Sequence, residues 1–125
     1  MQPNFKDIRQ GWRAESQIDT QVYHSESDVQ KAIVQAAIKS PRVAWISRNN
    51  VGSYRASGRT ITYGLGKGSS DLIGQLTDGR FLAVEVKHQG QPSDEQILFV
   101  NRIKMHGGCA GVCWSVADLE RLVGV

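Results

Sequence analysis

The chain has 125 residues, of which 40% are apolar and 22% are charged, and its formal net charge at pH 7 is +3. This length fits one domain, and the composition, with a mean hydropathy of −0.33, is typical of a globular protein rather than of a disordered tail or a membrane protein. No apolar run approaches the roughly 18 residues of a membrane-spanning helix, and residues 1–24 are polar and charged, so we expect neither a signal peptide nor an anchor. The expected location is intracellular, in the cytoplasm.

Two segments differ in pattern. Residues 1–24 hold scattered apolar side chains without a sustained period, so we expect an irregular N-terminal arm that docks on another surface, such as a second subunit. From Ser25 onward the pattern is regular, and residues 25–125 are predicted to form the folded domain. Ser25 and Asp28 suit the start of a helix, which Ser40-Pro41 would end.

Turn and capping residues divide the rest of the domain. A loop containing Gly and Asn is expected after the first strand, and Thr77-Asp78-Gly79 is a hairpin signal. Ser93 and Gln96 are typical of a helix start, and the apolar stripe of that helix is Gln96, Phe99, Val100 and Ile103. The predicted elements are helix 26–39, strand 43–47, strand 59–63, strand 71–76, strand 80–87, a helix opening at Ser93, strand 110–114 and a short helix capped by Ser115. This order predicts an α/β domain with a mixed four-stranded sheet flanked by helices.

The two cysteines, Cys109 and Cys113, lie four residues apart on one predicted strand. That spacing separates them by about 13 Å, beyond the ~7 Å limit between the Cα atoms of a disulfide. We therefore expect two buried free thiols, and no further Cys or His pair supplies the remaining ligands of a zinc site.

Positive charge is concentrated in residues 42–68, which include five cations, no acidic residue and two interleaved tyrosines. Mixed cationic and aromatic side chains suit a phosphate backbone with exposed bases or a distorted duplex. A solvated basic loop would explain the charge alone equally well. The candidate DNA-binding residues are Arg48, Asn50, Tyr54, Arg55, Arg59, Lys67, Ser69 and Ser70.

The register of the predicted 71–87 hairpin decides whether its acidic residues can cooperate. A three-residue loop with Gly79 in the left-handed region places Asp71 opposite Glu85, on one face. A two-residue turn would place the two carboxylates on opposite faces. Opposed residues have Cβ atoms about 4.5 to 5.5 Å apart, which lets two carboxylates share a divalent cation. Lys87 follows on the same face, where an ammonium can orient a water or meet charge developing on a phosphate.

Asp71 and Glu85-Val86-Lys87 resemble the motif of the PD-(D/E)xK nuclease superfamily, and the whole pattern most resembles its VRR-NUC family of small phage-type and repair nucleases. The resemblance covers about residues 25–122, although Ser70 stands where the superfamily motif has Pro. The supporting stretches are 25–33, 48–52, 68–72, 85–87 and 96–99.

The resemblance implies a restriction-endonuclease-like core with the element order αβββαβ(α) and a Mg²⁺- or Mn²⁺-dependent DNA endonuclease. It implies Asp71 and Glu85 as metal ligands, Lys87 as the residue that orients water or stabilises charge, and Gln96 as a fifth member that hydrogen-bonds Lys87 or the substrate. Glu26 is the expected helical acid for a second metal or a metal-bound water. Asp28 competes with it but already suits a cap.

The resemblance also implies branched DNA, such as four-way junctions or flaps, as the substrate and a homodimer as the active form. Two alternatives stay open: a catalytically silent nucleic-acid-binding module on the same fold, and an archaeal-type Holliday junction resolvase or restriction-like nuclease. A helicase or replication-repair protein that delivers the substrate is a further expected kind of partner.

Overall fold

A computed structural model describes residues 22–124, so the predicted N-terminal arm lies outside the described residues except for 22–24. None of the helices in this part of the chain is long and apolar enough to span a membrane. The elements are α2 (Glu26–Lys39), β1 (Val43–Arg48), β2 (Gly52–Ala56), β3 (Arg59–Tyr63), β4 (Leu72–Leu76), β5 (Phe81–Val86), α3 (Asp94–Met105), β6 (Cys109–Cys113) and α4 (Val116–Val123).

Four of the strands form one mixed sheet in the order β1-β4-β5-β6. The pairs β1–β4 and β4–β5 are antiparallel, and β5–β6 is parallel. Helix α3 supplies the long crossover that two consecutive parallel strands require. The predicted α/β class and the mixed four-stranded sheet are confirmed.

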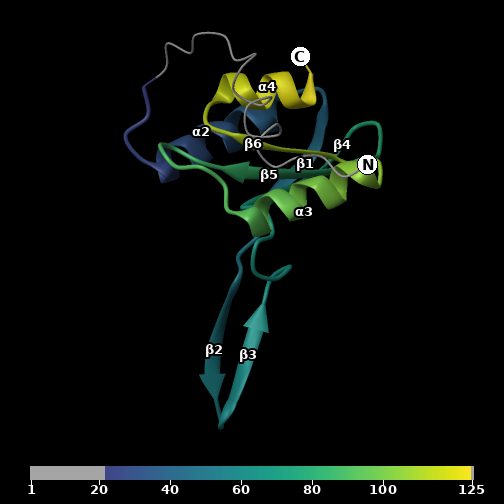
Figure 1. Ribbon diagram of the computed structural model, residues 1–125. Helices are drawn as coiled ribbons and strands as arrows, with labels where there is room; N and C mark the ends of the chain where they lie inside the picture. The colour runs from purple at the N-terminus through teal and green to yellow at the C-terminus, as the bar shows by residue number, and fades with distance from the viewer. Residues whose placement is uncertain (1–21, 125) are drawn as a thin grey trace.

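Helices cover both faces of this sheet (Figure 1). On α2, the fully buried side chains are Val29, Ile33 and Ala37, and their spacing of four residues keeps them on one side of the helix. They pack against β4, α4 and alternate residues of β5: Leu82, Val84 and Val86. On the opposite face, Ala83 packs with Val100 of α3 and Ala110 of β6. The residue next to Val84 and Val86, Glu85, therefore belongs to the α3 side of the sheet.

Strand β2 was not expected, because the Gly- and Asn-containing stretch was predicted to be a loop. Residues Gly52–Ala56 pair instead with β3 as a separate two-stranded sheet. The two-residue turn that joins them has positive φ at Ser57 and Gly58, of 51° and 75°. This turn fits the twist of paired strands and so allows a tight hairpin. Figure 1 shows the hairpin extending away from the main sheet.

The stripe predicted for α3 is partly wrong. Val100 is buried as expected, but Ile97 and Asn101 are buried too, whereas Gln96 and Phe99 are half-buried. Gln96 belongs to the first turn, where its side chain completes a cap. Polarity and position at the helix end therefore place Gln96 at the rim of the core.

Both cysteines on β6 are free and buried, as the sequence predicts. Burial raises the pKa of the Cys113 thiol well above its ordinary value. A protonated, enclosed thiol is a poor nucleophile, so neither cysteine is a candidate for chemistry.

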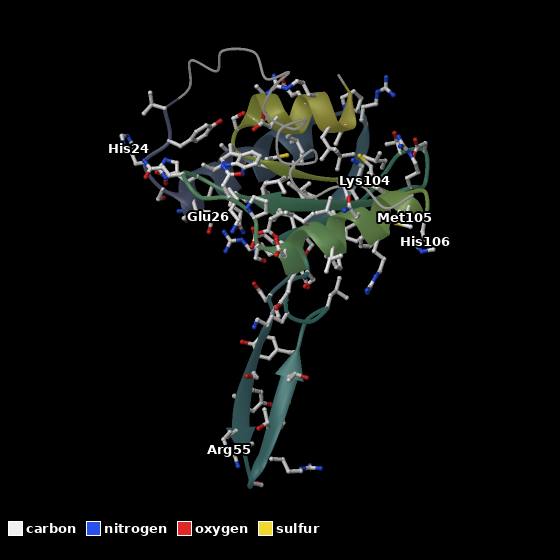
Figure 2. All side chains as sticks on the ribbon, in the orientation of Figure 1. His24, Glu26, Arg55, Lys104, Met105 and His106 are labelled. Atoms are coloured by element: carbon white, nitrogen blue, oxygen red, sulfur yellow. The ribbon has the colours of Figure 1, made fainter. Side chains whose placement is uncertain are left out.

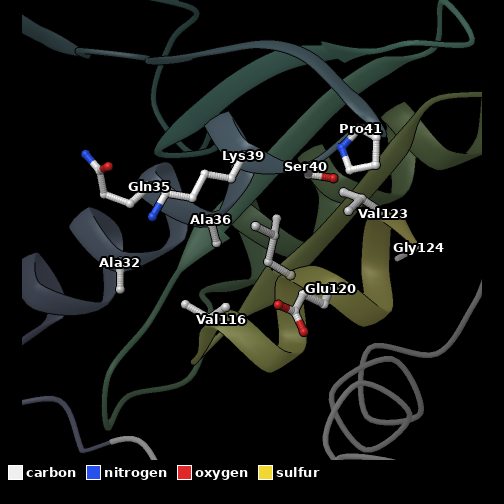
Figure 3. A pocket seen from close by; sticks show the side chains of 11 residues that line it. Ala32, Gln35, Ala36, Lys39, Ser40, Pro41, Val116, Glu120, Val123 and Gly124 are labelled. Carbon is white, nitrogen blue, oxygen red and sulfur yellow. The ribbon is translucent and has the colours of Figure 1, made fainter.

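A pocket of about 500 Å³ opens between α2 and α4. Figure 3 shows Ala36 and Lys39 of α2 beside Val116, Glu120 and Val123 of α4 around it. The pocket adjoins the C-terminal half of α2, whereas the predicted acidic residue Glu26 begins that helix. It is therefore separate from the acidic residues described next.

Candidate active site

The hairpin of β4 and β5 brings the two predicted catalytic carboxylates together. The ladder pairs Leu72 with Val84 and Gln75 with Phe81, so continuing it by one residue places Asp71 opposite Glu85. The turn is the three-residue loop expected, since Leu76 N–H donates to the Arg80 carbonyl and Gly79 has a φ of 96°. The register predicted from the sequence is confirmed.

Glu85 is a buried carboxylic acid with an incomplete set of hydrogen bonds. Its side chain is 1% exposed, and its Oε1 accepts a hydrogen bond of 3.0 Å from Nε2 of Gln96. Its Oε2 is buried and has no hydrogen-bond partner. Burial and the adjacent carboxyl group of Asp71 raise the pKa of Glu85 to about 9. This carboxyl group therefore requires either a proton or a cation to compensate it.

Asp71 is fixed by the strand opposite. Its Oδ2 accepts a hydrogen bond of 2.8 Å from the backbone N–H of Val86. This side-chain hydrogen bond thus replaces a backbone hydrogen bond at the point where the pairing between β4 and β5 ends. Because the N–H and C=O of one strand residue point to the same side of the strand, the Val86 carbonyl also points to the β4 side of β5.

Two further charged residues act on Glu85 from a distance. The positive charge of Lys87 lowers the pKa of Glu85, whereas the negative charge of Glu26 raises it. Figure 2 shows Glu26 at the end of the sheet where β5 finishes. Asp28 lies in the same helical turn but its carboxylate accepts from the His24 N–H. Asp28 therefore serves the helix start, whereas Glu26 is the acidic residue of α2 whose charge acts on Glu85.

Gln96 has two functions at once. Its Oε1 accepts from the Ser93 N–H at 2.9 Å, while the Ser93 hydroxyl accepts from the Gln96 N–H at 3.2 Å, which forms a complete capping box. The same side chain donates to Glu85. The helix cap thus holds the side-chain amide of Gln96 in the position from which it donates to Glu85, so the two functions are compatible.

The donor set fits a hard divalent cation. Within residues 22–124, no group of three or more His, Cys, Asp and Glu side chains is arranged to hold a metal ion. Asp71 and Glu85 instead form a pair, with Glu26 at longer range. Mg²⁺ is commonly bound through one or two carboxylates and several waters. The unpartnered Oε2 of Glu85 and the carboxylate of Asp71 could supply oxygen ligands of that kind.

The sequence matches the VRR-NUC domain family over residues 8–117. The chain belongs to this family. VRR-NUC domains are nuclease domains of the PD-(D/E)xK superfamily, so the resemblance and the restriction-endonuclease-like fold expected from it are confirmed. The comparison with curated proteins and the comparison with solved structures return no match. The family match begins inside the segment predicted to be an arm, and the boundary at residue 25 stays a prediction.

The VRR-NUC domain carries its predicted DNA-binding residues in two places. Tyr54, Arg55 and Arg59 lie on the projecting hairpin, and Figure 2 shows Arg55 near its tip. Other members surround a polar pocket of about 350 Å³ next to Asp71, whose lining residues are Gln30, Arg48, Asn49, Asn50, Val51, Ser69, Ser70 and Asp71.

Four of the predicted DNA-binding side chains already make polar contacts within the protein. One is Arg55, whose guanidinium donates to the Thr60 hydroxyl and to the Gly58 carbonyl, both at 3.4 Å. Ser70 is 1% exposed, and its hydroxyl donates to the Leu72 carbonyl. The Ser69 hydroxyl donates to the Gly66 carbonyl at 2.6 Å. Lys67 lies 3.9 Å from Glu95 in an exposed ion pair, which leaves it accessible because such pairs are weak.

Asn49 is a site residue that the sequence analysis missed, since it named the neighbouring Asn50. The Asn49 backbone N–H donates to the Asp71 carbonyl at 2.8 Å. Its side-chain amide donates to the Ser69 hydroxyl and the Ser70 carbonyl, and its Oδ1 accepts from the Leu65 N–H. Asn49 therefore ties both ends of the inserted hairpin to Asp71.

Proposed function

We propose that this VRR-NUC domain is a divalent-metal-dependent endonuclease that hydrolyses phosphodiester bonds in branched DNA. The observation that carries the proposal is the pairing of Asp71 with Glu85, whose buried Oε2 lacks a partner. A binding module has no use for such a pair, because two adjacent carboxylates repel DNA. A cation between them removes the repulsion and compensates the buried charge.

Asp71 and Glu85 would hold the cation, which supplies Lewis-acid stabilisation of the phosphate and lowers the pKa of a bound water. Gln96 holds Glu85 in place, and the Val86 N–H holds Asp71. Lys87, two residues after Glu85 on the same strand face, orients the attacking water or offsets charge on the phosphate. Glu26 lies at longer range, where it suits a second cation or a hydrogen bond to water.

Branched DNA and a homodimer are parts of the same proposal. The basic side chains Arg48, Arg55 and Arg59 provide phosphate contacts, which carry no sequence information. A domain of this size has no separate sequence-reading module. A two-fold symmetric junction suits two identical subunits that each make one nick. Light scattering at micromolar concentration, with and without a four-way junction, tests the dimer, and a monomer in both states would refute it.

The decisive experiment compares cleavage by the wild type, Asp71→Asn and Asp78→Asn. Asp78 is a matched control, because it is an exposed aspartate at the opposite end of the same hairpin, paired with Arg80. Labelled linear duplex, single strand, flap and four-way junction are incubated with Mg²⁺, with Mn²⁺ or with EDTA. We expect metal-dependent cutting of branched substrates by the wild type and Asp78→Asn, and none by Asp71→Asn. Cutting that survives EDTA or the Asp71 substitution would refute the assignment.

A further inference from the structure

The β2–β3 hairpin is separate from the hydrophobic core. None of residues 44–69 is buried, and the core clusters contain no residue of β2 or β3. Strands of five residues extend about 17 Å at 3.4 Å per residue. The chain thus projects a ribbon of this length that contributes no side chain to the core clusters.

The two faces of the hairpin differ in chemistry. The register pairs Gly52 with Tyr63 and Tyr54 with Ile61, so both tyrosines and Ile61 lie on one face. Tyr54 and Tyr63 are 54% and 49% exposed, and their ring centroids are 6.5 Å apart. The opposite face carries Arg55 with the hydroxyl residues Ser53, Thr60 and Thr62.

Glycine makes the aromatic face possible. A Cβ added at Gly52 would overlap the Tyr63 ring, so the ring lies directly over the Gly52 backbone. Tyr63 therefore has support on one side, and both tyrosine rings remain about half exposed. Exposed flat rings that are held in position suit stacking against another flat group.

The charge of the segment identifies that group as nucleic acid. Between Asp28 and Asp71 the sequence has no acidic residue, and Arg55 and Arg59 flank the tip of the hairpin. A second copy of the hairpin would bring like charges together, whereas DNA supplies phosphates for the arginines and bases for the rings.

The hairpin is also fixed relative to the carboxylate pair. Asn49, which precedes the inserted strands, bonds to Leu65, Ser69 and Asp71, which follow them. A Cβ at Gly64 would overlap the Asn50 carbonyl, so the two ends of the hairpin approach closely there. DNA held by the hairpin would thus have a defined position relative to Asp71.

We infer that the Tyr54–Tyr63 face stacks on bases that are unstacked at the branch point, and that this contact makes the enzyme prefer branched DNA over linear duplex. The inference rests on the proposed function and assigns its substrate preference to named residues. Bases inside a duplex offer no free face, so the tyrosines gain stacking contact only where bases are unstacked. Arg55 and Arg59 contact the flanking phosphates on both kinds of DNA.

The test is the ratio of affinities for a four-way junction and a linear duplex, measured by fluorescence anisotropy in EDTA. We compare the wild type with Tyr54→Ala/Tyr63→Ala and with Ser53→Ala/Thr62→Ala, a cross-strand pair on the opposite face. The tyrosine variant is expected to lower the ratio by roughly tenfold, the size of effect that stacking on a base produces. The control variant keeps the ratio of the wild type.

A ratio unchanged in the tyrosine variant overturns the inference, and so does an equal loss of affinity for both DNAs. A change of oligomeric state in the tyrosine variant by light scattering also overturns it, because the face would then contact a second copy. Thermal unfolding by circular dichroism verifies that each variant is folded. Because binding is measured without metal, a wild type that cuts no substrate refutes the proposed function and still leaves this test decisive.

Discussion

The pH dependence of stability gives the most direct test of the buried carboxyl group. Glu85 has a pKa of about 9 in the folded chain and about 4.5 when unfolded. Below pH 4.5 both states hold the proton, whereas between pH 4.5 and 9 only the folded state retains it. The contribution of Glu85 to the stability of the metal-free protein is therefore largest at low pH and falls as the pH rises through this window. One retained proton changes the free energy of unfolding by about 1.4 kcal/mol per pH unit.

Between pH 5 and pH 8, this proton alone lowers the stability of the metal-free wild type by about 4 kcal/mol. Glu85→Gln keeps the shape of the side chain and removes the titration. Urea unfolding in EDTA at pH 5, 6, 7 and 8 should therefore give a free-energy difference between variant and wild type that grows steadily with pH. Glu120→Gln, at an exposed glutamate of α4, is the control and should follow the wild type.

Divalent cations should reverse the loss of stability that ionisation of Glu85 causes at high pH. At pH 8, saturating Mg²⁺ is expected to raise the unfolding midpoint of the wild type and of Glu120→Gln, but not that of Glu85→Gln, because only ionised carboxylates bind the cation. If the free energy of unfolding changed with pH in the same way for the wild type and Glu85→Gln, burial would not hold a proton on Glu85. Equal stabilisation of both by Mg²⁺ would place the cation elsewhere.

Three further predictions concern packing, the capping glutamine and the thiols. Gly74→Ala should lower the free energy of unfolding in urea by about 1–3 kcal/mol, because its Cβ would overlap a backbone oxygen of β1. Gly90→Ala is the control, since a Cβ there meets open space, and equal unfolding midpoints for the two variants would contradict this prediction. Gln96→Ala should slow cleavage far more than Ser93→Ala, although both weaken the cap by about 1 kcal/mol, and equal rates would show that the amide on Glu85 is dispensable. Cys113 should react with a thiol reagent only as fast as the protein opens, and rapid labelling at pH 8 without denaturant would show that β6 is accessible.

The main elements and the carboxylate register were predictable because local signals determine them. Gly79 in a three-residue loop sets which residues of β4 and β5 are opposed, and that fixes Asp71 opposite Glu85. Capping residues Ser25, Ser93 and Ser115 mark the starts of all three described helices. Each of these signals acts within a few residues of the structure that it specifies.

The hairpin and its attachment were not predictable in the same way. Strand β2 has no buried residue and hence no apolar alternation, so only the Ser57-Gly58 turn signals it. The role of Asn49 depends on contacts with residues 16 or more positions later in the chain. Asn49 and Asn50 are identical in local sequence chemistry, and only the tertiary fold decides which of them turns toward Asp71.

The separation of the hairpin from the core has a consequence for amide hydrogen exchange. A two-stranded ribbon without buried side chains opens at little cost, so its amides exchange long before those of β5, which lies between β4 and β6. Exchange in β2 and β3 therefore reports local opening, whereas exchange in β5 reports unfolding of the whole domain. A bound DNA branch would slow amide exchange in the hairpin and leave exchange in β5 unchanged. One mass-spectrometric time course can therefore map substrate contact on the hairpin and monitor the stability of the domain.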